Sequence, residues 1–241
     1  MPRFFYDGDL AAGTEIRLPP AIAKHSAVLR LESASELTLF NGKGGEYHAV
    51  LSARGKDSAT VSIRSHDPVE RELPYRITLA QGIPESGKMD LIVEKAVELG
   101  VAAVQPVSAE RSVVRLKSDR AEKRVSRWRS IVHAACEQCG RNRLTDILSP
   151  VSLKEVIQVA GDSTLVLLSP QASLPLPAWA KSTEPGNLTL LIGPEGGFTP
   201  TEEALALAGG AVAVSMGDRI LRTETAAMAA VAAINAIWGG M

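Results

Sequence analysis

The chain has 241 residues, of which 45% are hydrophobic and 22% charged, and its formal net charge is −1. This composition excludes a disordered chain, and the length suffices for two ordinary domains. The start lacks the apolar region of a signal peptide, and no apolar run is long enough to span a bilayer, so we expect a cytoplasmic protein without a membrane contact. Cys136 and Cys139 have a CxxC spacing, but one pair offers too few ligands for zinc, and we expect ordinary helical thiols and no metal.

The first part of the chain is predicted to be mainly β. Short strands are expected at residues 3–6, 14–18, 36–41, 46–53 and 59–65, and one helix at residues 20–30 interrupts them. The run Asn41-Gly42-Lys43-Gly44-Gly45 is a strong hairpin turn. Five short strands and one helix favour a small β-barrel, a fold that often binds RNA, and we place this domain at residues 1–72.

A linker and a second domain follow. Residues 67–74 mix proline with alternating charge and lack a hydrophobic period. Beyond them a strand at residues 75–80, a helix at 88–99 and a strand at 101–107 alternate, which indicates an α/β domain over residues 73–241. Lys88, Lys95 and Glu98 on this helix could be functional or could simply form its charged outer face.

A basic segment covers residues 111–143, where ten Lys or Arg residues stand against three Asp or Glu. Residues 144–241 have the opposite balance, four against nine. A helix beginning near Ser118 has an apolar stripe that leaves its basic side chains on other faces, and this density is typical of binding to a phosphate backbone. Arg124 and Arg127 are therefore candidate RNA contacts. A solubilising surface is the alternative interpretation.

Three apolar strands end in polar or glycine-bearing turns. The strand at residues 164–168 precedes Ser169-Pro170, the strand at 188–192 precedes a turn over 193–197, and the segment 211–214 precedes a turn over 215–222. Thr199, Pro200 and Glu202 have the pattern of a helix start, and an alanine-rich helix is expected at 223–238. Ligands bind at the carboxyl ends of parallel strands, so these turns predict a binding site, although turns that need glycine only for their backbone geometry remain the alternative.

Two of these turns resemble those of a known family. Their sequences are Ile192-Gly193-Pro194-Glu195-Gly196-Gly197-Phe198-Thr199 and Leu221-Arg222-Thr223-Glu224-Thr225-Ala226. They are similar to the bacterial ribosomal RNA uridine-N3 methyltransferases of the RsmE type, members of the SPOUT superfamily. The resemblance extends over the whole chain and includes residues 2–5, 25, 28–30, 88–101, 110–112 and 137–141. It implies an α/β fold with a C-terminal SPOUT domain containing a parallel sheet and a deep trefoil knot, a small N-terminal PUA-like β-barrel domain, and a homodimer.

The resemblance also implies which residues form the site. The expected contacts to S-adenosylmethionine (AdoMet) are Leu168, Ile192, Gly193, Glu195, Gly196, Met216, Gly217, Ile220, Leu221, Thr223, Thr225 and Ala226. Arg222 and Arg141 are the candidates to stabilise the uridine anion, and Glu195 could either take its proton or order the turn. The first domain adds Arg3 and Arg30 as candidate RNA contacts.

The substrate implied by the resemblance is 16S ribosomal RNA within the assembled small subunit. Two other hypotheses remain open. An AdoMet-dependent enzyme for a small molecule would leave the basic segment and the first domain unexplained. A non-catalytic RNA-binding protein would leave the paired glycine turns unexplained.

Overall fold

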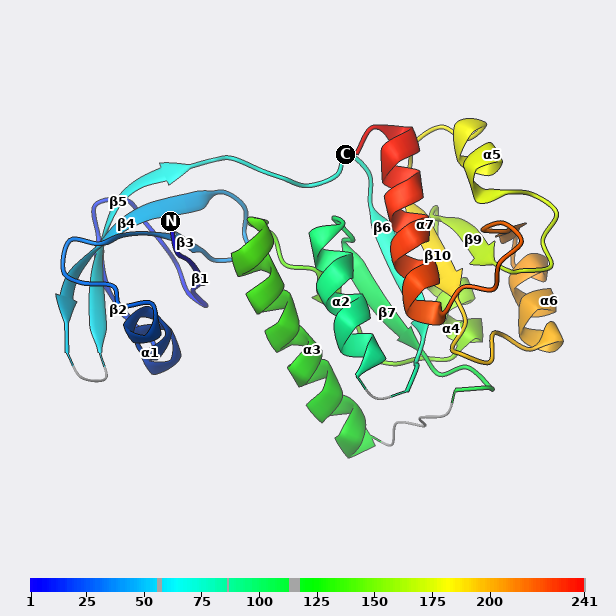
Figure 1. The fold of residues 1–241 in the computed structure, drawn as a ribbon, viewed down its shortest axis with the longest axis horizontal. Helices are drawn as coiled ribbons and strands as arrows, with labels where there is room; N and C mark the ends of the chain where they lie inside the picture. The colour runs from blue at the N-terminus through cyan, green and yellow to red at the C-terminus, as the bar shows by residue number, and fades with distance from the viewer. Residues whose placement is uncertain (56–57, 86, 113–117, 241) are drawn as a thin grey trace. The chain divides into compact units, whose positions relative to one another are not determined.

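The computed structural model describes residues 1–55, 58–85, 87–112 and 118–240, and it is shown as a ribbon in Figure 1. These residues form two compact units. The first unit combines Met1–Glu72 with Cys136–Leu144, and the second combines Leu73–Ala135 with Thr145–Met241. The segment Cys136–Leu144 thus lies in the first unit, whereas the sequence analysis places it in the second domain.

The first unit contains a five-stranded sheet and one helix, as the sequence predicts. Its strands occur in the order β1-β3-β4-β5-β2, with β1 and β3 parallel and the other neighbours antiparallel. Phe4, Leu37, Leu39 and Val61 are fully buried in its core. Among the described residues no ladder joins β1 to β2, so the sheet is open. The elements are β1 (Arg3–Phe5), β2 (Glu15–Leu18), α1 (Pro20–Val28), β3 (Glu36–Phe40), β4 (Glu46–Arg54) and β5 (Ala59–Asp67).

The segment Cys136–Leu144 is fixed to this sheet by polar contacts of Arg3. The guanidinium of Arg3 donates to Asn142 Oδ1 at 2.8 Å and to the Gly140 carbonyl at 3.2 Å, and it forms an ion pair with Glu46. Asn142 in turn donates to the Val69 carbonyl at 2.8 Å. Since the Arg3 side chain is only 13% exposed, its charge serves the packing of this unit.

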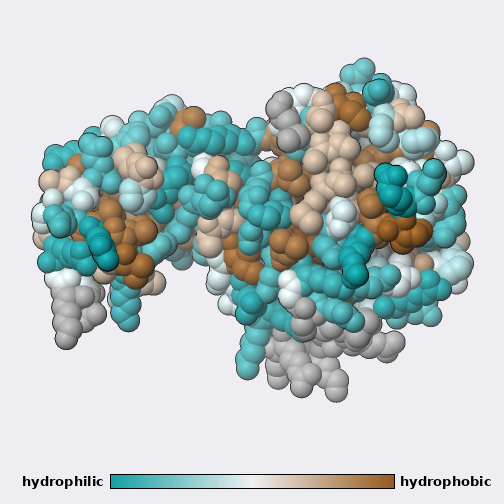
Figure 2. All heavy atoms as spheres, viewed as in Figure 1, coloured by the Kyte–Doolittle hydropathy of each residue, from teal (hydrophilic) through white to brown (hydrophobic). Residues whose placement is uncertain are grey.

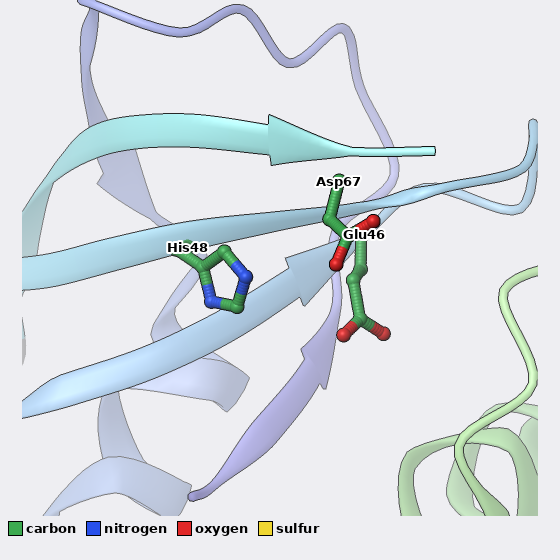
Figure 3. Close-up of side chains that lie close together, drawn as sticks. All are labelled: Glu46, His48 and Asp67. Carbon is green, nitrogen blue, oxygen red and sulfur yellow. The ribbon is translucent and has the colours of Figure 1, made fainter. Parts of the chain in front are cut away.

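Glu46 also belongs to a cluster with His48 and Asp67 on β4 and β5 (Figure 3), whose potential ligand atoms lie within 4.8 Å of one another. Burial alone would raise the pKa of the Glu46 carboxyl, but hydrogen bonds from Arg71 and Arg3 lower it below its usual value. Two guanidinium groups beside this carboxylate repel a cation and already satisfy its charge. We therefore assign Glu46 to its ion pairs with Arg3 and Arg71.

The second unit is built on a six-stranded parallel sheet with the order β11-β9-β10-β6-β7-β8. Leu188, Leu190 and Leu191 of β10 are fully buried, as expected for a strand covered on both faces. The elements are β6 (Ile77–Gly82), α2 (Lys88–Glu98), β7 (Ala103–Val107), α3 (Ser118–Cys139), β8 (Asp146–Ile147), α4 (Leu153–Val159), β9 (Thr164–Leu168), α5 (Leu176–Lys181), β10 (Leu188–Ile192), α6 (Pro200–Ala208), β11 (Val212–Val214) and α7 (Thr223–Trp238). The last four residues of α3 belong to the first unit.

Helices cover this sheet in two groups. Apolar residues of α4 and α6, among them Leu153 and Ala206, share one core with Leu167 and Leu191 of the sheet. Helix α7 packs against α2, α5 and β10. The strand order brings the carboxyl ends of β11, β9, β10 and β6 to neighbouring positions on one edge, where the predicted turns leave the sheet (Figure 1). None of the helices described has the length and apolar character needed to cross a membrane.

Candidate functional site

The turn between β10 and α6 is fixed at its far end by a capping box. Thr199 Oγ1 accepts from the Glu202 N–H at 3.2 Å, and Glu202 Oε2 accepts from the Thr199 N–H at 2.9 Å. Pro200 occupies the first helical position, where its missing N–H costs nothing. The predicted helix start is thus confirmed, and it confines the turn to residues 193–198.

Glycine is required in this turn because backbone segments approach very closely. A Cβ on Gly193 would lie 2.7 Å from the carbonyl carbon of Gly197, and a Cβ on Gly82, at the end of β6, would lie 2.5 Å from the Pro194 nitrogen. Gly197 adopts a φ of +68°, which side chains rarely allow. The turn therefore packs directly onto the end of β6.

Donors from two other elements hold the carbonyl groups of the turn. The Thr223 hydroxyl, at the start of α7, donates to the Gly193 carbonyl at 2.7 Å. Arg111, which follows β7, donates from Nη1 to the Gly196 carbonyl at 2.9 Å. These contacts fix the turn before any ligand arrives, which is the preorganisation that a binding loop needs.

A third contact runs through the side chain of Glu195. Its Oε1 accepts from Lys88 Nζ at 2.6 Å and from the Glu85 N–H at 3.0 Å. Burial alone would raise the pKa of Glu195, but the hydrogen bond from Lys88 and those from backbone N–H groups lower it below its usual value. A carboxylate stabilised in this way is a weak proton acceptor.

A cavity of about 440 Å³ lies at the carboxyl ends of β9, β10 and β11. Eleven of the twelve residues expected to contact the cofactor line it. They are Leu168, Ile192, Gly193, Glu195, Gly196, Met216, Gly217, Ile220, Leu221, Thr223 and Ala226. Thr225 is the exception, because it faces solvent on the first turn of α7.

The cavity also contains polar residues outside the set expected to contact the cofactor, although the turn that begins at Ser169 was expected to form one of its walls. Lys88 reaches it from α2, and Arg111 reaches it from the segment after β7. The sequence analysis leaves the role of Lys88 open. Ser169, Gln171 and Glu203 form a hydrogen-bonded group, with the Ser169 hydroxyl 3.0 Å from Gln171 Oε1 and 3.2 Å from Glu203 Oε2. Ser169 and Gln171 follow a strand, and this position indicates from the sequence that they could line a binding site. Glu203 has no sequence signal, because it occupies an ordinary helical position.

The two arginines expected to act together have different environments. Arg222 lines the cavity, is exposed, and has no ion pair among the described residues. Arg141 lies in the first unit, where its side chain is 4% exposed and forms a bidentate pair with Glu72, with Nε 3.0 Å from Oε1. The guanidinium of Arg141 is thus committed to a structural ion pair, and we do not retain it as a catalytic candidate.

Helix α3 buries the expected stripe of Val125, Trp128 and Val132. The side chain of Arg127 is 70% exposed and binds Asp90 Oδ2 with two nitrogens, at 2.7 and 2.9 Å. Arg124 is half-buried on the same helix. In the first unit, Arg30 is exposed just after α1 and has a φ of +55°. Arg30 is therefore more accessible to a ligand than Arg3, which is only partly exposed.

Comparison with known proteins gives consistent results. The profile of the RNA methyltransferase domain family matches residues 71–235, and that of the RNA methyltransferase PUA domain matches residues 18–64. The chain is 35% identical over 214 residues to ribosomal RNA small subunit methyltransferase E of Synechocystis sp., covering 87% of this chain and 69% of that protein.

Solved structures agree with this result. The structure of ribosomal RNA small subunit methyltransferase E from Neisseria gonorrhoeae, bound to S-adenosyl methionine, is 39% identical, has a TM-score of 0.91, and is matched over 99% of this chain and 98% of that one. A methyltransferase from Legionella pneumophila, in complex with the bound cofactor SAM, is 35% identical with a TM-score of 0.90, covering 97% and 96% of the two chains.

We predict that Gly193→Ala abolishes binding of AdoMet in a protein that remains folded. The added Cβ would meet backbone atoms of residues 197 and 198, which cannot move aside as a flexible side chain could. Calorimetry measures the binding, and circular dichroism reports the fold. Gly186→Ala is the matched control, since a Cβ there meets only one backbone oxygen, at 3.9 Å. Unchanged affinity in Gly193→Ala would contradict the assignment of this turn.

Proposed function

This chain belongs to the ribosomal RNA small subunit methyltransferase E family, and from this premise we propose that it transfers a methyl group from AdoMet to N3 of a uridine in 16S ribosomal RNA. The observation that carries the proposal is the cavity at the ends of β9, β10 and β11, built from the turns that the sequence analysis expects. We further propose that the substrate is the assembled small subunit in the cytoplasm.

The residues of the cavity suit AdoMet. Its volume of about 440 Å³ lies within the range of small-molecule sites. Apolar side chains such as Leu168, Ile220 and Leu221 provide surfaces for an adenine ring, and the glycine turns allow close approach of backbone groups. AdoMet supplies a methyl group already activated by its sulfonium, so the protein has to bind, orient and exclude water.

The acceptor chemistry assigns roles to Arg222 and Glu195. Uridine N3 becomes a nucleophile only after it loses its proton, and the resulting anion is stabilised by a nearby positive charge. Arg222 is exposed at the cavity and can provide that charge. Glu195 is bound by Lys88 and by a backbone N–H, so we propose that it orders the turn and that the N3 proton passes to solvent. The N3–CH3 bond then forms as the S–CH3 bond of AdoMet breaks, and S-adenosylhomocysteine leaves.

We predict that Arg222→Ala lowers turnover by about 100-fold, because it removes electrostatic stabilisation of the transition state. AdoMet affinity should change far less, since the arginine acts on charge at the base. Single-turnover methylation of small subunits and calorimetry measure the two effects. Lys154→Ala is the control, because it removes an exposed positive charge on α4. An equal loss of affinity and turnover would assign Arg222 to cofactor binding instead.

The methylated atom can be identified on the RNA. A uridine methylated at N3 cannot form a base pair, so it stops reverse transcription. Small subunits that lack the modification should acquire one new stop after incubation with enzyme and AdoMet, and the rate should rise with pH as the imide loses its proton. Methyl incorporation without a stop would exclude N3 as the acceptor.

We propose that α3 contacts the phosphate backbone through Arg124 and Arg127, and that Arg30 adds a contact from the first unit. Replacing Arg124 and Arg127 together by alanine should lower the salt slope of RNA binding by about 2, one for each lost phosphate contact. Filter binding at several salt concentrations measures the slope. Arg17→Ala, in β2, is a control for the loss of a positive charge. An unchanged slope in the double variant would mean that this face of α3 contacts solvent only.

A homodimer is also proposed, formed through α7. Apolar side chains remain partly exposed along this helix, and Figure 2 shows them gathered over it. They are Met228, Ala229, Ala232, Ala233, Ala236 and Ile237. Small side chains allow a second backbone to approach closely, and Leu91 on the adjacent helix α2 is 40% exposed. Sedimentation at micromolar concentration should give a dimer, and Ala233→Arg should give a monomer.

The same unit is proposed to contain a deep trefoil knot, the feature of SPOUT domains. From β9 the chain moves inward to β10 and then back across β9 to β11. Helix α7 then begins at the ends of β10 and β6, where Thr223 contacts Gly193 and Gln81. When the chain is unfolded by pulling on both ends, a knot should make its end-to-end length shorter than that of a fully extended chain, which is roughly 3.4 Å per residue. Full extension would exclude the knot.

A further inference from the structure

The first turn of α2 contains a positive charge, Lys88, as well as the acidic Asp90, which is paired with Arg127 of α3. Helix α2 begins at Lys88, and Gly87 at its N-cap provides no side-chain hydrogen bond. A positive charge at a helix N-terminus is unfavourable, because the unpaired N–H groups there already carry positive partial charge. Such local conflicts are concentrated at functional sites. The position of Lys88 therefore requires an explanation outside its own helix.

The explanation lies in the contact between α2 and the turn after β10. Lys88 Nζ lies 2.6 Å from Glu195 Oε1 and 3.7 Å from Glu85 Oε2. The Lys88 and Glu195 side chains are 25% and 27% exposed, so water still reaches part of the pair. Lys88 and Glu195 both line the cavity. The ion pair thus connects two separate walls of the site.

We propose that Lys88 is a positioning residue that holds Glu195, and through it the turn over residues 193–198, in the conformation that accepts the cofactor. The inference rests on the proposed function only in naming AdoMet as that cofactor. Thr223 and Arg111 hold the turn by its carbonyl groups, whereas Lys88 holds it by a side chain. Without Lys88, the carboxylate of Glu195 keeps only the hydrogen bond from the Glu85 N–H, and the turn loses its ion pair with α2.

The ion pair persists throughout the neutral pH range. Hydrogen bonding to Glu195 raises the pKa of Lys88, and the pKa of Glu195 is lowered. A carboxyl with a lowered pKa keeps its stabilising contact above its unfolded pKa and loses it as the pH falls through the folded value. The positioning effect is therefore constant near neutrality, and it is lost in acid as Glu195 is protonated and in strong alkali as Lys88 loses its proton.

The test compares two lysines of the same helix. Lys88→Met should weaken AdoMet binding by about 10-fold, the size expected for losing a hydrogen bond to a charged group. Turnover at saturating AdoMet should remain close to that of the unchanged protein, because Lys88 does not contact the reacting atoms. Lys95→Met is the matched control, since Lys95 pairs with Glu94 and Glu98 at 2.7 Å on its own helix. Its AdoMet affinity should be unchanged.

Two further variants separate positioning from general stability. Lys88→Arg should bind AdoMet with most of the affinity of the unchanged protein. The double variant Lys88→Glu with Glu195→Lys, which exchanges the two charges, should bind AdoMet more tightly than either single variant. Equal affinity of Lys88→Met and the unchanged protein would overturn the inference, and so would a loss of turnover at unchanged affinity. If Lys88→Met does not fold, the Lys88→Arg and charge-exchange variants decide. A protein that binds AdoMet through Lys88 but leaves ribosomal RNA unmethylated would refute the proposed function and not this inference.

Discussion

The close approach of the turn after β10 to the end of β6 is the constraint on which the site depends. No side chain fits at Gly82 or Gly193, because backbone atoms occupy the space where a Cβ would lie. This contact brings the turn within reach of α2, α7 and the segment after β7, each of which contributes one anchoring side chain. A shift of this turn would weaken the contacts of all three side chains at once, so substitutions of these side chains are expected to have coupled effects.

The arginines of this protein differ in burial and in the partners that surround them. Arg141 and Arg222 are chemically identical and both belong to segments that resemble the same family. Arg141 is enclosed with Glu72 and stabilises the first unit, whereas Arg222 is exposed at the cavity. Arg3 and Arg30 differ in the same way. Membership of a matching motif therefore does not by itself place a charged side chain at the cavity.

Much of the second unit could be predicted from the sequence because its signals are local. Apolar runs, glycine turns and the Thr199–Glu202 capping box locate the strands and the cavity, since parallel strands bring their carboxyl ends together. The sequence analysis did not predict α4, although Ser152 and Glu155 form a capping box at its start. It did not predict β8 either, because that strand has only two residues. The partners of Arg3 and Arg141 could not be predicted, because they lie far away in the sequence and depend on tertiary packing.

The discontinuous first unit has a consequence for biosynthesis. Five of its strands are complete once residue 67 has been made, but Asn142 and Gly140, which bind Arg3, belong to a segment synthesised much later. During synthesis, the N-terminal sheet therefore lacks part of the final contacts of Arg3 and Glu72. These contacts can form only after more than half of the chain has been made. Its completion is coupled to the synthesis of α3, so the sheet and the basic helix mature together.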